Sequence, residues 1–180
     1  MIWNIPILIN TFNKESKLLN VDNSLLTKKH RWEDIAAALG MGNLPAESYY
    51  LGRYFIFNDE QDIQKLEELL TIEIKYLAVM KEWQVGKVNL PAMATLICNE
   101  LKIMTVCTYC EGLGFESDGE DCQRCKGYGW KSFSEREKYQ FIGANYQAWH
   151  RRWQGRYMQL LNFIGDAAYV LRMHLNHQLY

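Results

Sequence analysis

The feature of this sequence that most constrains its fold is an eight-residue phrase, Cys-x-x-Cys-x-Gly-x-Gly, that occurs twice. The copies begin at Cys107 and Cys122, and 11 residues separate Cys110 from Cys122. Two Cys-x-x-Cys pairs at this separation can supply four thiolates to one tetrahedral ion, each pair holding it from a tight turn. The spacing predicts one structural zinc ion bound by Cys107, Cys110, Cys122 and Cys125.

The glycines of the repeats fit the same site, because a turn that points backbone amides at sulfur needs residues able to adopt positive φ. Gly112, Gly114, Gly127 and Gly129 follow the two pairs at matching offsets. Residues 115–121, FESDGED, are typical of the tip of a β-ribbon. Two disulfides are an alternative that a reducing compartment disfavours, and a redox-active Cys-x-x-Cys would not need the duplication. A closed tetrathiolate site has no open position for a substrate, which argues against hydrolytic catalysis.

Composition is that of an ordinary globular chain. With 180 residues, 48% of them apolar, it can bury one sizeable core. The apolar start, MIWNIPILIN, is interrupted by Pro6 and lacks the basic region and cleavage site of a signal peptide. No segment reaches the apolar length of a membrane span. We therefore expect a cytoplasmic protein without membrane association, in which thiolate ligation is favoured over disulfides.

The net charge of −1 conceals an uneven distribution along the chain. Residues 1–121 carry 11 basic against 18 acidic side chains, a balance of −7. Residues 122–180 carry 9 against 3, a balance of +6. A surface that binds a polyanion is therefore expected in the C-terminal part, with a merely solvated basic face as the alternative.

Helical patterns account for the chain from residue 31 to the first cysteine pair. Asn58 with Gln61 resembles a capping box that opens the longest of these helices. Cys98 falls among apolar neighbours, where a buried and inert thiol is expected. The predicted helices span residues 31–43, 44–55, about 59–83 and 89–104.

The segment after the second cysteine pair has the order helix, short glycine-containing turn, second helix. Ser134 and Glu137 form a capping box for the first helix, and Asn145 is placed to cap the second. The second helix carries an apolar stripe at helical spacing, which predicts its buried face. The stripe consists of Trp149, Trp153, Tyr157, Leu160, Ile164, Ala168, Leu171 and Leu175.

Polar and basic side chains occupy the other face of the first turns of this helix, where recognition helices meet base edges. Arg and Gln are the side chains that read guanine and adenine bidentately. We expect Arg151, almost opposite the stripe, to contact a base, and Arg152 to contact a phosphate. An ordinary helical hairpin is the alternative. The candidate DNA-binding residues are Asn145, Gln147, Ala148, Arg151, Arg152, Arg156 and Lys131.

Together these patterns predict a mainly α protein. Residues 1–31 have no assigned role, and residues 32–180 are expected to form a single helical domain. A four-cysteine zinc β-ribbon is inserted at residues 105–132, and a helix-turn-helix occupies residues 134–180. The chain contains no phosphate-binding loop, zinc-protease motif or nucleophile elbow, so we expect neither an enzyme nor a small-molecule substrate.

The order of a short helix ending in DIAAALGMGN, a helical middle, the two cysteine phrases and a Trp-bearing helix-turn-helix resembles the lambda-type phage Q antitermination proteins. The resemblance covers roughly residues 32–179. It implies zinc ligation by the four cysteines of the repeats and a DNA-reading role for the helix that starts near Tyr146. It also implies a late-gene regulator of phages and prophages. Such a protein binds double-stranded DNA overlapping a promoter and makes paused bacterial RNA polymerase holoenzyme resistant to terminators.

The acidic, helix-rich residues 32–104 are the expected polymerase-contacting part, because phosphate would repel them from the duplex. Exposed acidic positions such as Glu67 or Glu68 are the candidates for this contact. Two other functions stay open. One is a DnaJ-type zinc chaperone module, although that module normally carries four copies of the phrase and two ions. The other is a phage repressor or DNA adaptor that never contacts polymerase.

Overall fold

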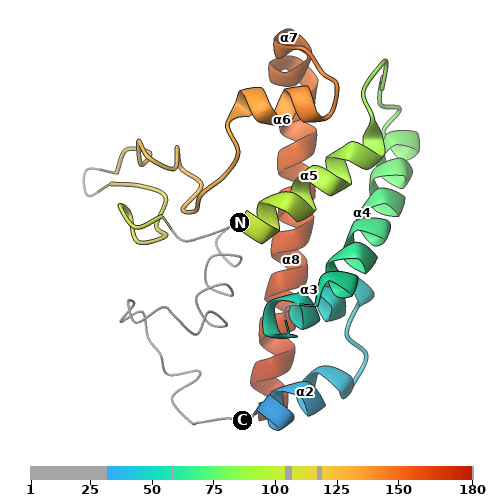
Figure 1. The fold of residues 1–180 in the computed structure, drawn as a ribbon, viewed down its shortest axis with the longest axis vertical. Helices are drawn as coiled ribbons and strands as arrows, with labels where there is room; N and C mark the ends of the chain where they lie inside the picture. Colours follow the sequence, from blue (N-terminus) through green and yellow to red (C-terminus); the bar gives the residue numbers. More distant parts are fainter. Residues whose placement is uncertain (1–31, 58, 104–106, 117–118, 180) are drawn as a thin grey trace.

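The computed structural model of the chain describes residues 32–57, 59–103, 107–116 and 119–179, and α-helices dominate it (Figure 1). The expectation of a mainly α protein is confirmed. Residues 1–31 lie outside the described residues. The elements are α2 (Trp32–Gly40), α3 (Ala46–Phe57), α4 (Glu60–Met80), α5 (Leu90–Ile103), α6 (Glu135–Phe141), α7 (Tyr146–Ala148), a π-helical turn (Trp149–Trp153) and α8 (Gln154–Leu179).

A long helix at the end of the chain forms the spine of the molecule (Figure 1). α7, the π-helical turn and α8 follow one another without interruption, so the backbone is helical from Tyr146 to Leu179. Every residue of the predicted apolar stripe is buried, which confirms the predicted face. α2 and α3 pack against α8, near the end of the molecule opposite α7.

The central helices complete the core. α3 packs against α4, and α4 packs against α5. Their buried side chains join those of the long helix in one contiguous hydrophobic cluster. Cys98 of α5 lies in this cluster, and burial raises the pKa of its thiol to about 12. The expectation that Cys98 is buried is confirmed, and a thiol with so high a pKa is a poor nucleophile.

Two predicted caps in the C-terminal part are confirmed. The Ser134 hydroxyl accepts the backbone N–H of Glu137, and the Glu137 carboxylate accepts the backbone N–H of Ser134, which completes the capping box. The Asn145 side chain accepts the backbone N–H of Ala148 at 2.8 Å. Local side-chain chemistry therefore sets where both helices of this segment begin.

The boundaries of α4 differ from the prediction. Asn58, the predicted cap, lies outside the described residues, and Asp59 caps the helix by accepting a backbone N–H at 2.9 Å. The helix ends at Met80 and does not reach Trp83. The Trp83 ring packs edge-on against the Trp153 ring, with centroids 6.0 Å apart. Trp83 therefore lies outside α4 and contacts a distant segment of the chain. Helical periodicity, which predicted a helix to about Trp83, gives no information about this contact.

Two expectations for the C-terminal half are met only in part. Within residues 105–132, Phe115 and Asp121 form an isolated antiparallel bridge, and no strand is found in the described residues. The predicted β-ribbon was therefore wrong in extent, because the backbone amides of these loops bond to sulfur and to carbonyls across the loops. Residues 134–179 have the predicted order helix, turn, helix, but most of the second helix belongs to the core.

Membrane spanning has no support in the helices that are described. In residues 32–57, 59–103, 107–116 and 119–179, no helix combines the length and the apolar character that crossing a bilayer requires. The long helix carries polar and charged side chains along its exposed face, among them Asp166. Its apolar stripe is buried in the protein core.

A buried ion pair ties α5 to α6 and to the segment that leaves the cysteine loops. Glu100 of α5 is fully buried, and its Oε1 accepts from Lys138 Nζ of α6 at 3.2 Å. The same oxygen accepts the backbone N–H of Phe133 at 3.1 Å and the hydroxyl of Ser132. Three donors from two segments therefore stabilise one carboxylate in the interior.

Aromatic rings enclose the other partner of this pair. The Lys138 ammonium lies 4.6 Å from the ring centroid of Tyr128 and 4.7 Å from that of Tyr157 on α8. Burial lowers the pKa of Lys138, and the neighbouring Glu100 carboxylate opposes that change. Ring faces attract a desolvated cation, so these contacts add to the ion pair.

Lys138→Met is expected to lower the free energy of unfolding by about 3–5 kcal/mol, because it leaves Glu100 buried without its counter-ion. The double variant Glu100→Gln/Lys138→Met should recover most of this loss, since no unpaired charge stays buried. Denaturant unfolding measures both values. Lys75→Met, on the exposed surface of α4, is the matched control and should change stability by no more than about 0.5 kcal/mol. Equal losses in the single and double variants would contradict the assignment.

Candidate metal centre and nucleic-acid interface

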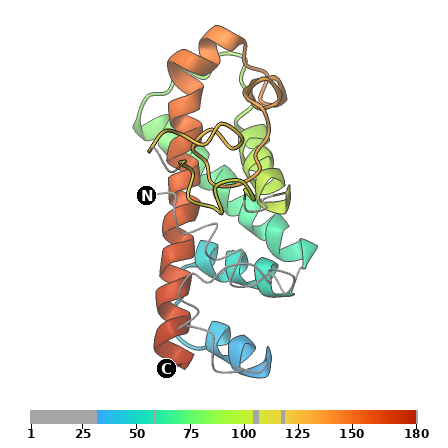
Figure 2. The same cartoon turned by 90° about the vertical axis from the view of Figure 1, so that its left-hand side faces the viewer.

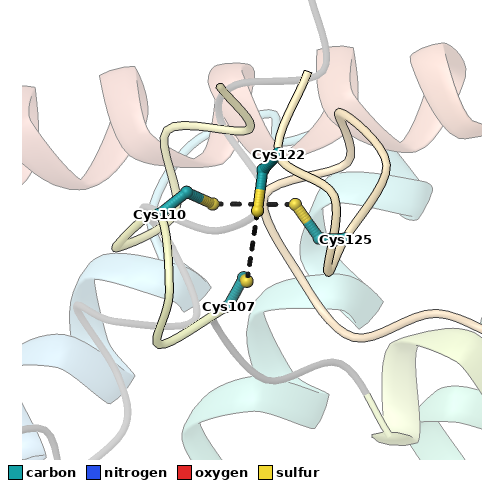
Figure 3. A group of neighbouring side chains, drawn as sticks. All are labelled: Cys107, Cys110, Cys122 and Cys125. Carbon is teal, nitrogen blue, oxygen red and sulfur yellow. Dashed lines mark hydrogen bonds between the residues drawn. The ribbon is translucent and has the colours of Figure 1, made fainter. Parts of the chain in front are cut away.

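The four cysteines of the repeats converge on one point (Figure 3). Their sulfur atoms all lie within 4.8 Å of one another. The Cys107 and Cys122 sulfurs are 4.0 Å apart, and those of Cys110 and Cys125 are 3.6 Å apart. Four sulfurs bound at about 2.3 Å to a tetrahedral zinc ion lie roughly 3.8 Å from one another. The cluster therefore fits one metal ion, and an all-thiolate donor set is one that zinc prefers.

Equivalent backbone amides of the two repeats point at sulfur. Gly114 donates its N–H to Cys110 Sγ at 3.3 Å, and Gly129 donates its N–H to Cys125 Sγ at 3.2 Å. Each amide follows its cysteine at the same offset, so the two loops have the same local structure. Such bonds stabilise the negative charge that a thiolate brings to the site.

The loops also bond to each other in a reciprocal way. The Cys107 amide donates to the Gly129 carbonyl at 2.9 Å, and the Cys122 amide donates to the Gly114 carbonyl at 2.8 Å. The first cysteine of each repeat therefore bonds to the last glycine of the other. This exchange relates the two repeats by an approximate two-fold axis.

The last glycine of each repeat is required where the loops cross. A Cβ on Gly114 would lie 2.5 Å from the Gly127 carbonyl oxygen, and one on Gly129 would lie 2.5 Å from the Gly112 carbonyl oxygen. Gly114 and Gly129 also have φ values of +82° and +78°, which L-residues with side chains rarely adopt. The sequence suggested the positive φ, whereas the crossing of the two loops is visible only in the structure.

The thiols of the cluster differ in acidity. Burial acts to raise the pKa of Cys122, but hydrogen bonds from the backbone of Cys125 and Arg124 and from the thiols of Cys125 and Cys110 lower it to about 7. Burial raises the pKa of Cys110, and raises that of Cys125 to about 12. Because only thiolates bind zinc, the ion has to displace protons from these two buried thiols. Metal affinity therefore rises with pH.

The second group of predicted residues lies at the end of the long helix that is remote from α2 (Figure 1). Asn145, Gln147, Ala148, Arg151 and Arg152 line one surface depression there. The two arginines and Gln147 are exposed. The structure thus brings together five of the seven residues predicted to bind DNA. We call this region, residues 145–152, the basic tip.

The other two predicted DNA-binding residues lie outside the depression. The guanidinium carbon of Arg156 lies 4.6 Å from the Trp83 ring centroid and 4.3 Å from the Trp153 ring centroid. Burial lowers the pKa of Arg156, so its environment is partly desolvated. Lys131 is exposed on the segment between the cysteine loops and α6. Arg156 is better placed to hold the indole rings together than to contact a ligand.

The loop between α4 and α5 supports the basic tip. This support was not predicted from the sequence. Arg152 Nη1 donates to Gln84 Oε1 at 3.3 Å, and the Asn89 amide donates to the Ile142 carbonyl at 3.0 Å. Lys87 lines a second depression that shares Asn145, Ala148 and Arg152 with the first. Neither segment carries a local motif for this contact, so no sequence signal identified it.

A π-helical turn in the basic tip was also not predicted. The Gln154 amide bonds to the Trp149 carbonyl, one residue farther back than in an α-helix. Arg151 and Arg152 project from this wide turn, while its two tryptophans are buried. Single π-turns occur frequently at functional sites. The π-helical turn therefore lies in the region where the arginines had predicted DNA contacts.

Comparison of the chain with protein-family models, with curated proteins and with solved structures gave no match. The resemblance to phage Q antitermination proteins therefore depends on the sequence motifs described above.

Cys122→Ser is expected to abolish binding of the single zinc ion, because removing one ligand leaves an incomplete tetrahedral site. Thiolate ligation contributes on the order of 10 kcal/mol at neutral pH, so the cysteine loops should lose their structure with the metal. Metal analysis of protein purified under reducing conditions gives the zinc content. Cys98→Ala is the matched control and should keep one ion per chain. Two ions in the wild type, or full zinc content in Cys122→Ser, would refute the site.

Proposed function

We propose that the protein is a zinc-containing, DNA-binding transcription regulator that acts as an antiterminator of the phage Q type. The observation that carries the DNA-binding part is the clustering of five predicted contact residues in one depression at the exposed end of the molecule. The antitermination part rests on the motif-level resemblance. In this proposal the cysteine cluster has a structural role and no catalytic one.

The basic tip would meet the duplex with the N-terminal turns of the long helix. Arg151 is exposed and makes no ion pair that would occupy its guanidinium among the described residues, which suits a base contact. Arg152 is already oriented by Gln84, which suits a fixed phosphate contact. The balance of +6 over residues 122–180 would add attraction that does not depend on sequence.

Polymerase contacts are assigned to exposed acidic side chains outside the basic tip. Glu67 is a poor candidate, because it is half-buried and its carboxylate accepts the Thr95 hydroxyl at 2.6 Å. Glu68 is exposed, but it pairs with Lys65 at 3.1 Å. Glu33 is exposed on α2, at the end of the molecule opposite α7. Its charge can therefore be changed with little effect on DNA.

Arg151→Ala is expected to weaken binding to a cognate duplex by roughly 1–3 kcal/mol and to relax its sequence preference, because a base contact is lost. Arg152→Ala should weaken all sequences alike and reduce the salt slope by about one. The duplex is obtained by selecting wild-type protein against a random DNA library, and fluorescence anisotropy at several salt concentrations gives the affinities.

Arg172→Ala is the control for this experiment, since it removes the same charge roughly 30 Å farther along the helix. It should leave sequence preference unchanged. Failure to select any sequence, or an Arg151→Ala variant with wild-type affinity and preference, would eliminate the basic tip as a reader.

Wild-type protein is expected to raise terminator read-through in transcription in vitro from a template with the selected site, a promoter-proximal pause and a downstream terminator. Glu33→Lys should keep or slightly improve DNA affinity, because it removes repulsion from phosphate, and should lower read-through. The pairing of both measurements separates DNA binding from polymerase contact. If the protein binds DNA site-specifically but does not raise read-through, the antiterminator proposal is wrong. The repressor or adaptor function would then be the better proposal.

A further inference from the structure

We propose that metal occupancy of the cysteine cluster controls the conformation of the basic tip, and that Lys138 is the positioning residue that couples the two regions. The cysteine loops lie to one side of the helical body, away from the end that carries α7 (Figure 2). The coupling therefore has to run through packed side chains. It needs metal binding but does not depend on the DNA-binding proposal.

The first link joins the metal loops to the residues that follow them. The carbonyl of Gly129 accepts the Cys107 amide, so closure of the loops fixes the backbone immediately before Trp130. Trp130 is only 1% exposed, and its ring packs on the Tyr128 ring with centroids 5.7 Å apart. The chain therefore leaves the metal site through residues 128–133, which we call the exit path and which Trp130 anchors in the core.

The second link is the carboxylate of Glu100. Its Oε1 accepts from Ser132 and Phe133 of the exit path and from Lys138 of α6. Its Oε2 is buried and has no hydrogen-bond partner among the described residues. The charge of Glu100 is thus stabilised at one oxygen, and loss of the exit-path donors would leave that oxygen with Lys138 as its remaining donor. Because a buried charge with too few donors is costly, this arrangement responds to movement of residues 128–133.

The third link joins α6 to the basic tip. The carbonyl of Tyr139, next to Lys138, accepts the amide of Ala144 at 2.8 Å, which fixes the turn before the long helix. The Tyr139 ring also contacts the Tyr146 ring edge-on, with centroids 6.3 Å apart. Glu135 of α6 accepts the Gln154 side-chain amide at 3.2 Å. A shift of α6 therefore moves both sides of the π-helical turn.

Two states follow from these links. With metal bound, the exit path supplies its donors to Glu100, and α6 holds the turn and the basic tip in the described arrangement. Without metal, the loops open, the donors leave, and Lys138 no longer has a fully stabilised partner. Linkage requires the effect to be reciprocal, so fixing the tip in its described arrangement would also strengthen metal binding.

Hydrogen exchange measured by mass spectrometry on the full chain, with bound zinc and after chelation, tests this coupling. Chelation of the wild type should speed exchange in residues 134–153 by about tenfold. Exchange in α3 and α4 should change far less, because α3 packs mainly on α4 and α8, and α4 packs mainly on α3 and α5. Unchanged exchange in residues 134–153 would overturn the proposal, and so would an equal increase over the whole chain.

The double variant Glu100→Gln/Lys138→Met separates coupling from stability. It should still bind one zinc ion, and chelation should no longer change exchange in residues 134–153. Lys75→Met is the control and should respond to chelation as the wild type does. A double variant that responds like the wild type would show that the effect does not pass through Lys138, and the proposal would fall.

Discussion

A buried carboxylate can persist only where the fold brings donors to it, and Glu100 imposes this requirement on three parts of the chain at once. Its position on α5 draws in the exit path of the cysteine loops through Phe133 and draws in α6 through Lys138. Lys138 in turn lies over Tyr157 of the long helix. One charge pair thus joins α5, α6 and the segment that leaves the cysteine loops, and both of its side chains are closed to solvent.

Two exposed arginines and an acidic helical turn lie at opposite ends of the molecule. Arg151 and Arg152 are exposed at the end of the molecule that carries α7, whereas α2, with Glu33 in its first turn, lies at the opposite end. The net charge of −1 therefore conceals a polarity between these two groups of side chains. Such a polarity orients the molecule as it approaches a polyanion, before any specific contact is made.

Local signals in the sequence predicted much of this structure. The spacing of the cysteines predicted their cluster, and helical periodicity predicted the buried stripe of the long helix. The caps at Ser134 and Asn145 predicted where two helices begin. Two features that were not predicted share a cause, because each depends on residues far apart in the chain. The pairing of Glu100 with Lys138 and the support of Arg152 by Gln84 both join distant segments. Periodicity and capping carry no information about such partners.

The approximate two-fold relation of the cysteine loops has a consequence for how this module can change during evolution. Each eight-residue copy contributes half of the ligands and half of the crossing, so neither copy can form the site alone. The spacing inside a copy is therefore constrained by both the sulfur positions and the close approach at Gly114 and Gly129. The linker at residues 115–121 supplies no ligand, and its ends, Phe115 and Asp121, pair in an antiparallel bridge. Changes of length are therefore expected to be tolerated between Phe115 and Asp121, inside this bridge, and to disrupt the site when they fall within a repeat.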